Sequence, residues 1–207
     1  NLKTQNHNLK LKAEDYNLID LFNGQEDLRN KLIRAVGNPE IRFEEDALRM
    51  MRAVRLATQL GFEIESVTKR AIYKLAGNLE FVSKERIRDE LIKILMTSRA
   101  QYGIELLHEL GLLKHIMPEL EEGLGIDQRG PHKYQVWEHS LRALDYAVRQ
   151  EWSLRIRLAA LLHDVGKALD HEVAGTHVEI GVEICNRYKI RPEVIHCVAA
   201  HHEDIPM

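Results

Sequence analysis

Hydrophobic residues recur at helical spacing along most of the chain, and the clearest stretch is 41–62. Its apolar positions are Phe43, Ala47, Met50, Met51, Val54 and Ala57. A period of three to four residues predicts a helix with one apolar side. Since the stretch has no Pro and no Gly before Gly61, the pattern predicts a single uninterrupted helix.

The polar side of this predicted helix carries a charged set. Glu45, Asp46 and Arg49 stand at i, i+1 and i+4, and Arg52 and Arg55 continue the series. One interpretation is an exposed helix with salt bridges, each worth about 0.2–0.5 kcal/mol. The other is a binding surface that combines carboxylates with guanidinium groups.

The same periodicity predicts further helices over 62–82, 83–96 and 102–110, and then over several segments after 136. The alternating pattern near the N-terminus predicts two short strands joined around 13–17. Residues 121–135 contain three Gly and one Pro, which predicts a linker between helical units at 29–120 and 136–207. The predicted fold class is therefore all-α, with a short β element at the N-terminus.

Composition agrees with a packed helical protein. Hydrophobic residues make up 44% and charged residues 29%, while aromatic residues make up only 6%. The net charge of −3 does not by itself indicate a nucleic-acid partner. Its distribution is uneven, because residues 29–60 carry more Lys and Arg than Asp and Glu, and residues 161–207 show the opposite balance.

Cysteine use and hydropathy indicate the compartment. The two cysteines, Cys185 and Cys197, are not at C-x-x-C spacing, so we expect small core residues in a reducing environment. No apolar run approaches about 18 residues, which argues against a membrane partner. The chain opens with polar residues rather than a signal peptide. A cytoplasmic protein is the expectation, and its oligomeric state is not indicated.

The run RFEEDALRMMRAVRLATQLGF resembles the neck of bacterial tRNA nucleotidyltransferases, the CCA-adding enzymes and their poly(A) polymerase relatives. In that family an E-D-x-x-R motif acts as a template for the incoming nucleotide, and the matching residues are Glu45, Asp46 and Arg49. A carboxylate can accept from the exocyclic amine of cytosine or adenine, and an Arg can donate to ring acceptors. The resemblance also implies that Arg52 and Arg55 contact the triphosphate of CTP or ATP.

The resemblance extends well beyond the motif. Residues 18–28 resemble the segment that leads from the nucleotidyltransferase head into the neck, and the match is nearly continuous over 41–120. It implies that 1–28 is the end of the head and that 29–120 forms the neck and body, which bind the tRNA acceptor end. The D-x-D pair that holds Mg for transfer is absent from 1–28. Either the transferase centre lies in a head outside this chain, which we expect, or the chain is a remodelled relative.

Histidine accumulates in the second half of the chain. His139, His163-Asp164, His177 and His201-His202 fall on successive helical segments or the loop before one. A single His in a core is ordinarily a structural residue whose hydrogen bonds are satisfied. Four separate His sites, one of them next to an Asp, are harder to explain in this way. Imidazole and carboxylate groups suit divalent transition metals, and neighbouring helices can bring them together.

This order of residues resembles the HD phosphohydrolase superfamily. The resemblance implies a divalent metal (Mn, Ni, Fe or Mg), held first by His139, His163 and Asp164. It further implies extra ligands of two-metal members at His177, His201 and His202. Asp164 and Lys167 would be catalytic, with Lys167 holding a phosphate. The usual final Asp does not occur by Met207, so we expect the HD domain, 136–207, to be C-terminally incomplete and its metal site to be one ligand short.

The HD part resembles two families. Residues 132–145 are similar to the HD domain of CCA-adding enzymes, whereas residues 161–205 are more similar to that of ribonuclease Y, which cleaves RNA. Three hypotheses follow. The chain serves tRNA 3′-end processing with an appended phosphohydrolase; or it is a metal-dependent phosphodiesterase or endoribonuclease of ribonuclease Y type; or it is a helical RNA-binding fragment without catalysis.

Overall fold

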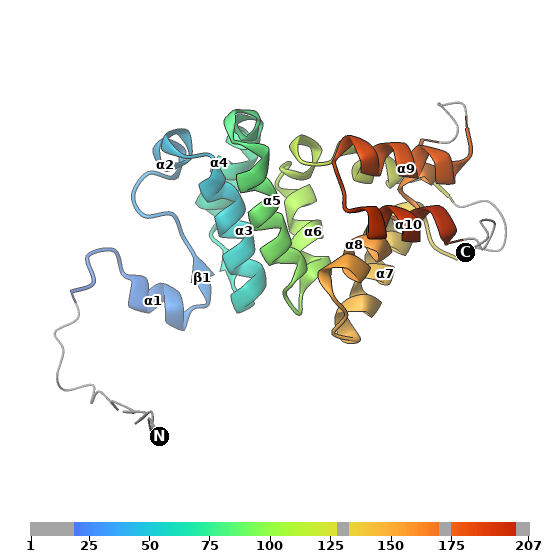
Figure 1. Cartoon of the computed structure of the whole chain (residues 1–207). Helices are drawn as coiled ribbons and strands as arrows, with labels where there is room; N and C mark the ends of the chain where they lie inside the picture. The colour runs from blue at the N-terminus through green and yellow to red at the C-terminus, as the bar shows by residue number, and fades with distance from the viewer. Residues whose placement is uncertain (1–18, 128–132, 170–174, 202–207) are drawn as a thin grey trace, which may run out of the picture.

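A computed structural model of the chain describes residues 19–127, 133–169 and 175–201, and it confirms the predicted all-α class (Figure 1). The first part consists of α1 (Gly24–Arg29), β1 (Leu32–Ile33), α2 (Pro39–Glu45), α3 (Leu48–Leu60), β2 (Glu63–Ile64), α4 (Ser66–Leu75), η2 (Ala76–Phe81), α5 (Lys84–Leu95) and α6 (Ala100–Glu109). The second consists of η3 (Leu113–His115), η4 (Pro118–Gly123), α7 (Val136–Arg149), α8 (Leu154–Leu162), η5 (Val165–Ala168), α9 (His177–Arg187) and α10 (Pro192–Ala200).

The prediction of one uninterrupted helix over 41–62 is wrong, because the chain breaks at Asp46 between α2 and α3. Asp46 has an extended backbone (φ −152°, ψ 100°), and its Oδ1 accepts a hydrogen bond from the backbone N–H of Leu48 at 3.2 Å. A short carboxylate side chain can compete in this way with the backbone ladder of a helix. The second helix ends as expected at Gly61, whose φ is +68°.

Other boundaries differ in smaller ways. The helix predicted over 62–82 is α4 followed by the 3-10 helix η2, and a two-residue strand precedes it. That strand, β2, pairs in parallel with β1 through Leu32–Glu63 and Ile33–Ile64. The strands predicted around 13–17 lie outside the described residues. The helices predicted over 83–96 and 102–110 are α5 and α6, with Gly111 at φ +68° after α6.

One hydrophobic core extends from α2 to α10. Within the neck it contains the fully buried Met50, Met51 and Val54 of α3, and within the second half it contains Leu144 and Val198. The 3-10 helix η4, Pro118–Gly123, overlaps the start of the predicted linker, 121–135, and packs against α7 and η5. The two predicted units, 29–120 and 136–207, therefore share one hydrophobic core, and a division of function between them stays a prediction.

The cysteine expectation is half right. Cys185 is buried on α9, and burial raises the pKa of its thiol to about 11. Cys197 on α10 is exposed. Of the helices in the described part of the chain, none combines the length and the apolar character needed to cross a bilayer.

A buried arginine joins the two halves. Arg157 on α8 is 6% exposed, and its Nη1 donates to the carbonyl oxygens of Leu95 at 2.8 Å and Thr97 at 3.0 Å. Its Nε donates to the carbonyl oxygen of Trp152 at 2.9 Å. The last carbonyls of a helix lack partners within the helix and carry partial negative charge. Carbonyl oxygens at the end of α5 thus accept the hydrogen bonds of a buried guanidinium group. Among the described residues, no carboxylate forms an ion pair with this group.

We predict that Arg157→Met lowers the free energy of unfolding by about 2 kcal/mol or more, since buried carbonyls lose their donors. Arg155→Met is the matched control two residues away. Arg155 is exposed and lies 3.8 Å from Glu193, so its removal should cost at most about 1 kcal/mol. Urea unfolding of both variants measures the difference, and equal destabilisation would contradict the role given to Arg157.

Candidate functional site

The candidate metal centre lies where the ends of four helices meet. His139 is in the first turn of α7, His163 follows α8, and Asp164 precedes η5. His177 is the first residue of α9, and His201 directly follows α10. Side chains at helix ends can converge on one point without crossing a packed helix face. Of the predicted ligands, His202 lies outside the described residues.

Asp164 stands between two groups of histidines. The Nε2 atoms of His139 and His163 lie 3.0 Å apart, and each lies 3.4 Å from Oδ2 of Asp164. On the other side, Nε2 of His201 lies 3.1 Å from Oδ1 of Asp164. The ring centroid of His177 is 5.6 Å from that of His201. The predicted residues therefore form two groups that share one carboxylate: His139, His163 and Asp164, and Asp164, His177 and His201.

The donor atoms fit a divalent metal. Within each group they all lie within 4.8 Å of one another. Ligand atoms that are each about 2.0–2.2 Å from one ion lie roughly 3 to 3.5 Å apart, which matches the spacing around His139, His163 and Asp164. The Nδ1 atoms of His163 and His201 lie 2.9 Å and 2.6 Å from the carbonyl oxygens of Ala160 and Val198. Such bonds fix the ring orientation and leave Nε2 for a metal.

The electrostatics keep Asp164 ionised. The carboxylate is buried, and burial alone would raise its pKa. The hydrogen bonds from His201 and Lys167 outweigh burial, so the pKa of Asp164 lies far below its usual value. Lys167 Nζ is 2.9 Å from Oδ2 of Asp164. Burial lowers the pKa of His163, which favours the neutral imidazole that ligates metals.

Gly166 sets the distance between η5 and α9. A Cβ atom built on Gly166 would collide with the carbonyl oxygen of His177 and would lie 2.7 Å from the backbone nitrogen of Gly181. Both are backbone atoms, so no side chain can move aside to make room. The absence of a side chain at Gly166 therefore lets α9 carry His177 up to Asp164.

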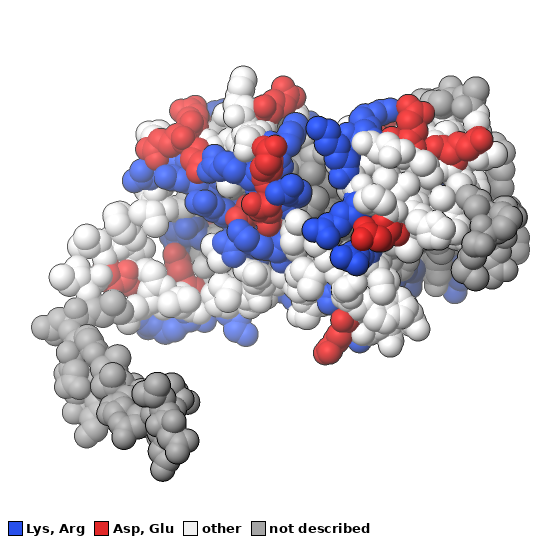
Figure 2. Space-filling view, in the orientation of Figure 1, with Lys and Arg blue, Asp and Glu red and all other residues white. Residues whose placement is uncertain are grey.

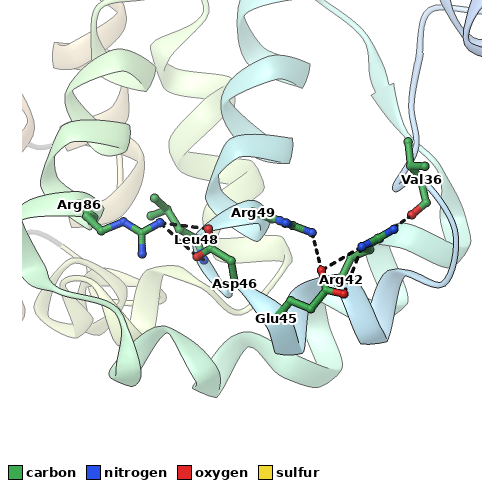
Figure 3. A network of polar contacts seen from close by, with 7 residues as sticks. All are labelled: Val36, Arg42, Glu45, Asp46, Leu48, Arg49 and Arg86. Atoms are coloured by element: carbon green, nitrogen blue, oxygen red, sulfur yellow. Dashed lines mark hydrogen bonds and ion pairs between the residues drawn. The ribbon is translucent and has the colours of Figure 1, made fainter.

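The second candidate site lies at the break between α2 and α3, and Figure 3 shows how its side chains diverge. Glu45 Oε2 lies 3.0 Å from Nη1 of Arg42 and 3.0 Å from Nη1 of Arg49. Asp46 points away from Glu45, and its Oδ2 lies 3.0 Å from Nη2 of Arg86 on α5. The predicted pairing of Glu45 with Arg49 is present, but the prediction that Glu45, Asp46 and Arg49 share one face is wrong because the helix breaks at Asp46.

A cavity of about 380 Å³ lies beside this break. Its cationic lining consists of Arg34, Arg42, Arg49 and Arg52. Neither Glu45 nor Asp46 is among the described residues that line it, and neither is Arg55. Arg52 is exposed and makes no hydrogen bond or ion pair with the described part of the chain. The cavity thus offers four guanidinium groups to an anionic ligand, and Arg52 is the one that forms no ion pair within the described part of the chain.

Arg55 is committed to another contact. Its Nε lies 2.6 Å from Oε2 of Glu90, and its Nη1 donates to Gln59 at 2.7 Å. Glu90 is buried, and its other oxygen accepts from Lys93 at 2.9 Å. Burial alone would raise the pKa of Glu90, but Lys93 and Arg55 together lower it.

Glu90, Arg34 and Arg86 belong to these networks although no sequence pattern singled them out above. Glu90 could have been found, because Ile87, Glu90 and Ile94 fall on one buried face of α5. A carboxylate within an apolar stripe requires a buried cationic partner. No comparable signal marks Arg86, which lies 40 residues from Asp46 and meets it only through the packing of α5 on α3.

Comparison with known proteins places two families along the chain. Residues 61–124 match the family described as a probable RNA- and SrmB-binding site of polymerase A, and residues 136–207 match the HD domain. The interval between these matches lies within the predicted linker, 121–135.

Curated relatives are tRNA nucleotidyltransferases. An A-adding enzyme from Deinococcus radiodurans is 41% identical over 161 residues, which cover 74% of this chain and 37% of the relative. A CC-adding enzyme from Thermus thermophilus is 39% identical over 175 residues, which cover 77% of this chain and 40% of the relative. This chain therefore spans about two fifths of the length of these relatives.

A solved structure agrees with the sequence comparisons. The crystal structure of the Bacillus stearothermophilus CCA-adding enzyme in complex with CTP superposes with a TM-score of 0.52 at 29% identity. The match covers 91% of this chain and 42% of that enzyme.

We predict that Gly166→Ala weakens metal binding at least about tenfold, because α9 must move away from η5 and carry His177 with it. Gly77→Ala is the control, since the nearest atom to its added Cβ would be 3.9 Å away, on His115. Metal affinity by calorimetry and urea unfolding together test this. Unchanged metal affinity in a folded Gly166→Ala protein would contradict it.

Proposed function

We propose that this chain, which belongs to the bacterial tRNA nucleotidyltransferase family and carries an HD domain, serves the processing of tRNA 3′ ends. The neck selects C or A from CTP and ATP, and the HD domain hydrolyses a phosphate ester with a divalent metal. The observation that carries the first part is the arginine-lined cavity beside the E-D-x-x-R motif.

The proposal assigns nucleotide transfer to a separate head. This chain contains no D-x-D pair to hold Mg for the transfer step. Its own contribution is to bind the nucleotide and the tRNA acceptor end. Arg52, which lines the cavity, binds the triphosphate, and a guanidinium group suits this task because it stays charged and donates in a planar fork.

Asp46 and Arg49 read the base in this proposal. Asp46 is partly exposed and ionised, because the hydrogen bonds from Arg86 and from the Leu48 backbone lower its pKa against the opposing effect of burial. An ionised carboxylate accepts hydrogen bonds and does not donate them. It therefore favours the amino groups of cytosine and adenine over the carbonyl oxygen that uracil presents. Glu45 positions Arg49 through their ion pair at 3.0 Å.

In the HD domain, His139, His163 and Asp164 hold one divalent cation, and His177 and His201 supply ligands on the other side of Asp164. A metal bound there supplies a nucleophile at neutral pH and neutralises charge on the phosphate. Lys167 keeps Asp164 oriented through its bond at 2.9 Å and presents a positive charge to the phosphate. The residue types permit Mn, Ni, Fe or Mg.

A second candidate function is a phosphodiesterase or endoribonuclease of ribonuclease Y type. The observation that favours it is the second ligand group, Asp164, His177 and His201, because two cations sharing a carboxylate can hold both the attacking and the leaving oxygen of a phosphodiester.

In the enzyme that includes the head, we predict that Asp46→Ala reduces the preference for CTP and ATP over UTP and GTP by about 10–100-fold. This is the reduction expected when one hydrogen bond to a charged group is removed. Asp89→Ala is the control, since Asp89 is exposed and pairs only with its neighbour Arg88 among the described residues. Incorporation assays with each nucleotide measure the preference. If Asp46→Ala keeps the full preference for CTP and ATP, Asp46 does not read the base, and its ion pair with Arg86 is purely structural.

We predict that Asp164→Asn lowers metal-dependent hydrolysis of generic phosphomonoesters and phosphodiesters by about 100-fold or more and reduces the bound metal. Asp145→Asn is the control on α7, where Asp145 pairs with Arg149 at 2.6 Å. A chelator should abolish hydrolysis while RNA binding persists, because the cations of the neck need no metal. Metal analysis that finds equal content in both variants would contradict the ligand assignment.

A further inference from the structure

We propose that the turn between α9 and α10 extends the RNA-binding surface of the neck onto the HD domain, with the phosphate backbone of an RNA stem as its occupant. The inference rests on the proposed function for the choice of RNA as partner. It is independent of the chemistry at the metal centre. We call this turn, residues 187–191, the basic turn.

The basic turn is positively charged, whereas the segment that contains it is acidic. Residues 161–207 contain more Asp and Glu than Lys and Arg, yet Arg187, Lys189 and Arg191 fall within five consecutive positions. A positive patch on an acidic unit creates a local attraction for polyanions. The concentration of cations at one turn is therefore a feature that the metal centre does not require.

Two of these cations are available to a ligand. Arg187 pairs with Glu119 at 3.0 Å and with Glu183 at 3.7 Å. Lys189 and Arg191 are exposed, and their side chains make no hydrogen bond or ion pair with the described part of the chain. Their full charge can therefore meet a phosphate without first breaking an internal contact.

The backbone of the basic turn is held in place. The hydroxyl of Tyr188 donates to Oε2 of Glu119 on η4 at 2.7 Å, and the N–H of Ile190 donates to the carbonyl oxygen of Cys185 at 3.0 Å. Ile190 is half-buried against the core, between the exposed Lys189 and Arg191. Because the backbone is already ordered, a ligand has to immobilise only two side chains.

The basic turn and the cations of the neck belong to elements that are connected through helix contacts, α5 with α8, α8 with α10 and α10 with α9. A series of contacts connects them: Arg55 and Lys93 share Glu90, the end of α5 binds Arg157, and Arg155 lies 3.8 Å from Glu193 at the start of α10. Figure 1 places the turn between α9 and α10 on the side of the HD domain that faces α5 and α6. In Figure 2, Lys and Arg side chains gather over the neck helices and continue onto the adjoining edge of the HD domain.

The chemistry favours a nucleic-acid backbone over an anionic membrane. A membrane-binding surface would pair its cations with exposed apolar side chains that enter the interface. At the basic turn the apolar residues, Tyr188 and Ile190, are half-buried and contact the protein. The exposed side chains at the turn are the cations Lys189 and Arg191, which suit the phosphates of an RNA.

The test uses the full chain and a tRNA transcript without its 3′ CCA. Binding is measured by fluorescence anisotropy between about 50 and 200 mM salt, the range over which phosphate contacts change affinity strongly. The variant is the double substitution Lys189→Gln with Arg191→Gln. We expect weaker binding and a slope of log affinity against log salt that is smaller by roughly 1 for each phosphate that the variant no longer neutralises. Binding of the trinucleotide CCA, which is too short to leave the neck, should not change.

Lys31→Gln is a matched control. Lys31 has φ 53° and Lys189 has φ 52°; both follow the end of a helix, and both are exposed. Lys31 lies beside β1, at the other end of the molecule from α9 and α10 (Figure 1). We expect Lys31→Gln to leave the salt slope unchanged.

The outcomes separate the two proposals. Wild-type protein that binds no tRNA at any salt would overturn the proposed function, and this inference with it. Salt-dependent binding that is the same in the wild type and the double variant would overturn the inference alone. The inference would also be overturned if the wild type binds vesicles with anionic lipids, and the double variant loses this binding but keeps its tRNA binding.

Discussion

The second half of the structure depends on the burial of a single carboxylate, Asp164. Removing an ionised carboxylate from water is costly unless several donors surround it. Here His139, His163, Lys167 and His201 supply that environment from α7, the α8–η5 junction and the end of α10. Because the donors that stabilise this charge come from different helices, the ends of these helices must meet at one point. The candidate metal centre is thus also the junction at which these helices meet.

The sequence predicted the members of this centre better than it predicted the neck. Histidine and aspartate in a hydrophobic context have few satisfactory environments, so their identity and order already indicate that they meet. The break at Asp46 has no such signal. No Gly or Pro marks it, and it depends on a side-chain bond to Leu48 and on Arg86, which approaches from a helix 40 residues away. The local pattern of apolar residues predicts a helix well. It does not predict a side chain that tertiary packing brings close from a distant part of the sequence.

Helix ends matter at both candidate sites for a common reason. At an end, backbone groups lack partners and a side chain can point along the axis as well as outward. His163, Asp164, His177 and His201 use ends to converge on one another. Asp46 uses the junction of two helices to separate from Glu45, its neighbour in sequence. Periodicity alone assigns such residues to a face, and that is why the prediction that Asp46 shares a face with Glu45 and Arg49 was wrong.

The single hydrophobic core and the buried Arg157 have a thermodynamic consequence. Elements that share a core and a buried polar junction tend to unfold together, so a ligand of either half raises the melting temperature of both by mass action. Metal bound among the histidines would then protect amides of α5 from hydrogen exchange, although α5 touches no ligand. Through such linkage, a metal bound in the second half would change how long α3 and α5 stay folded, without any change in their shape.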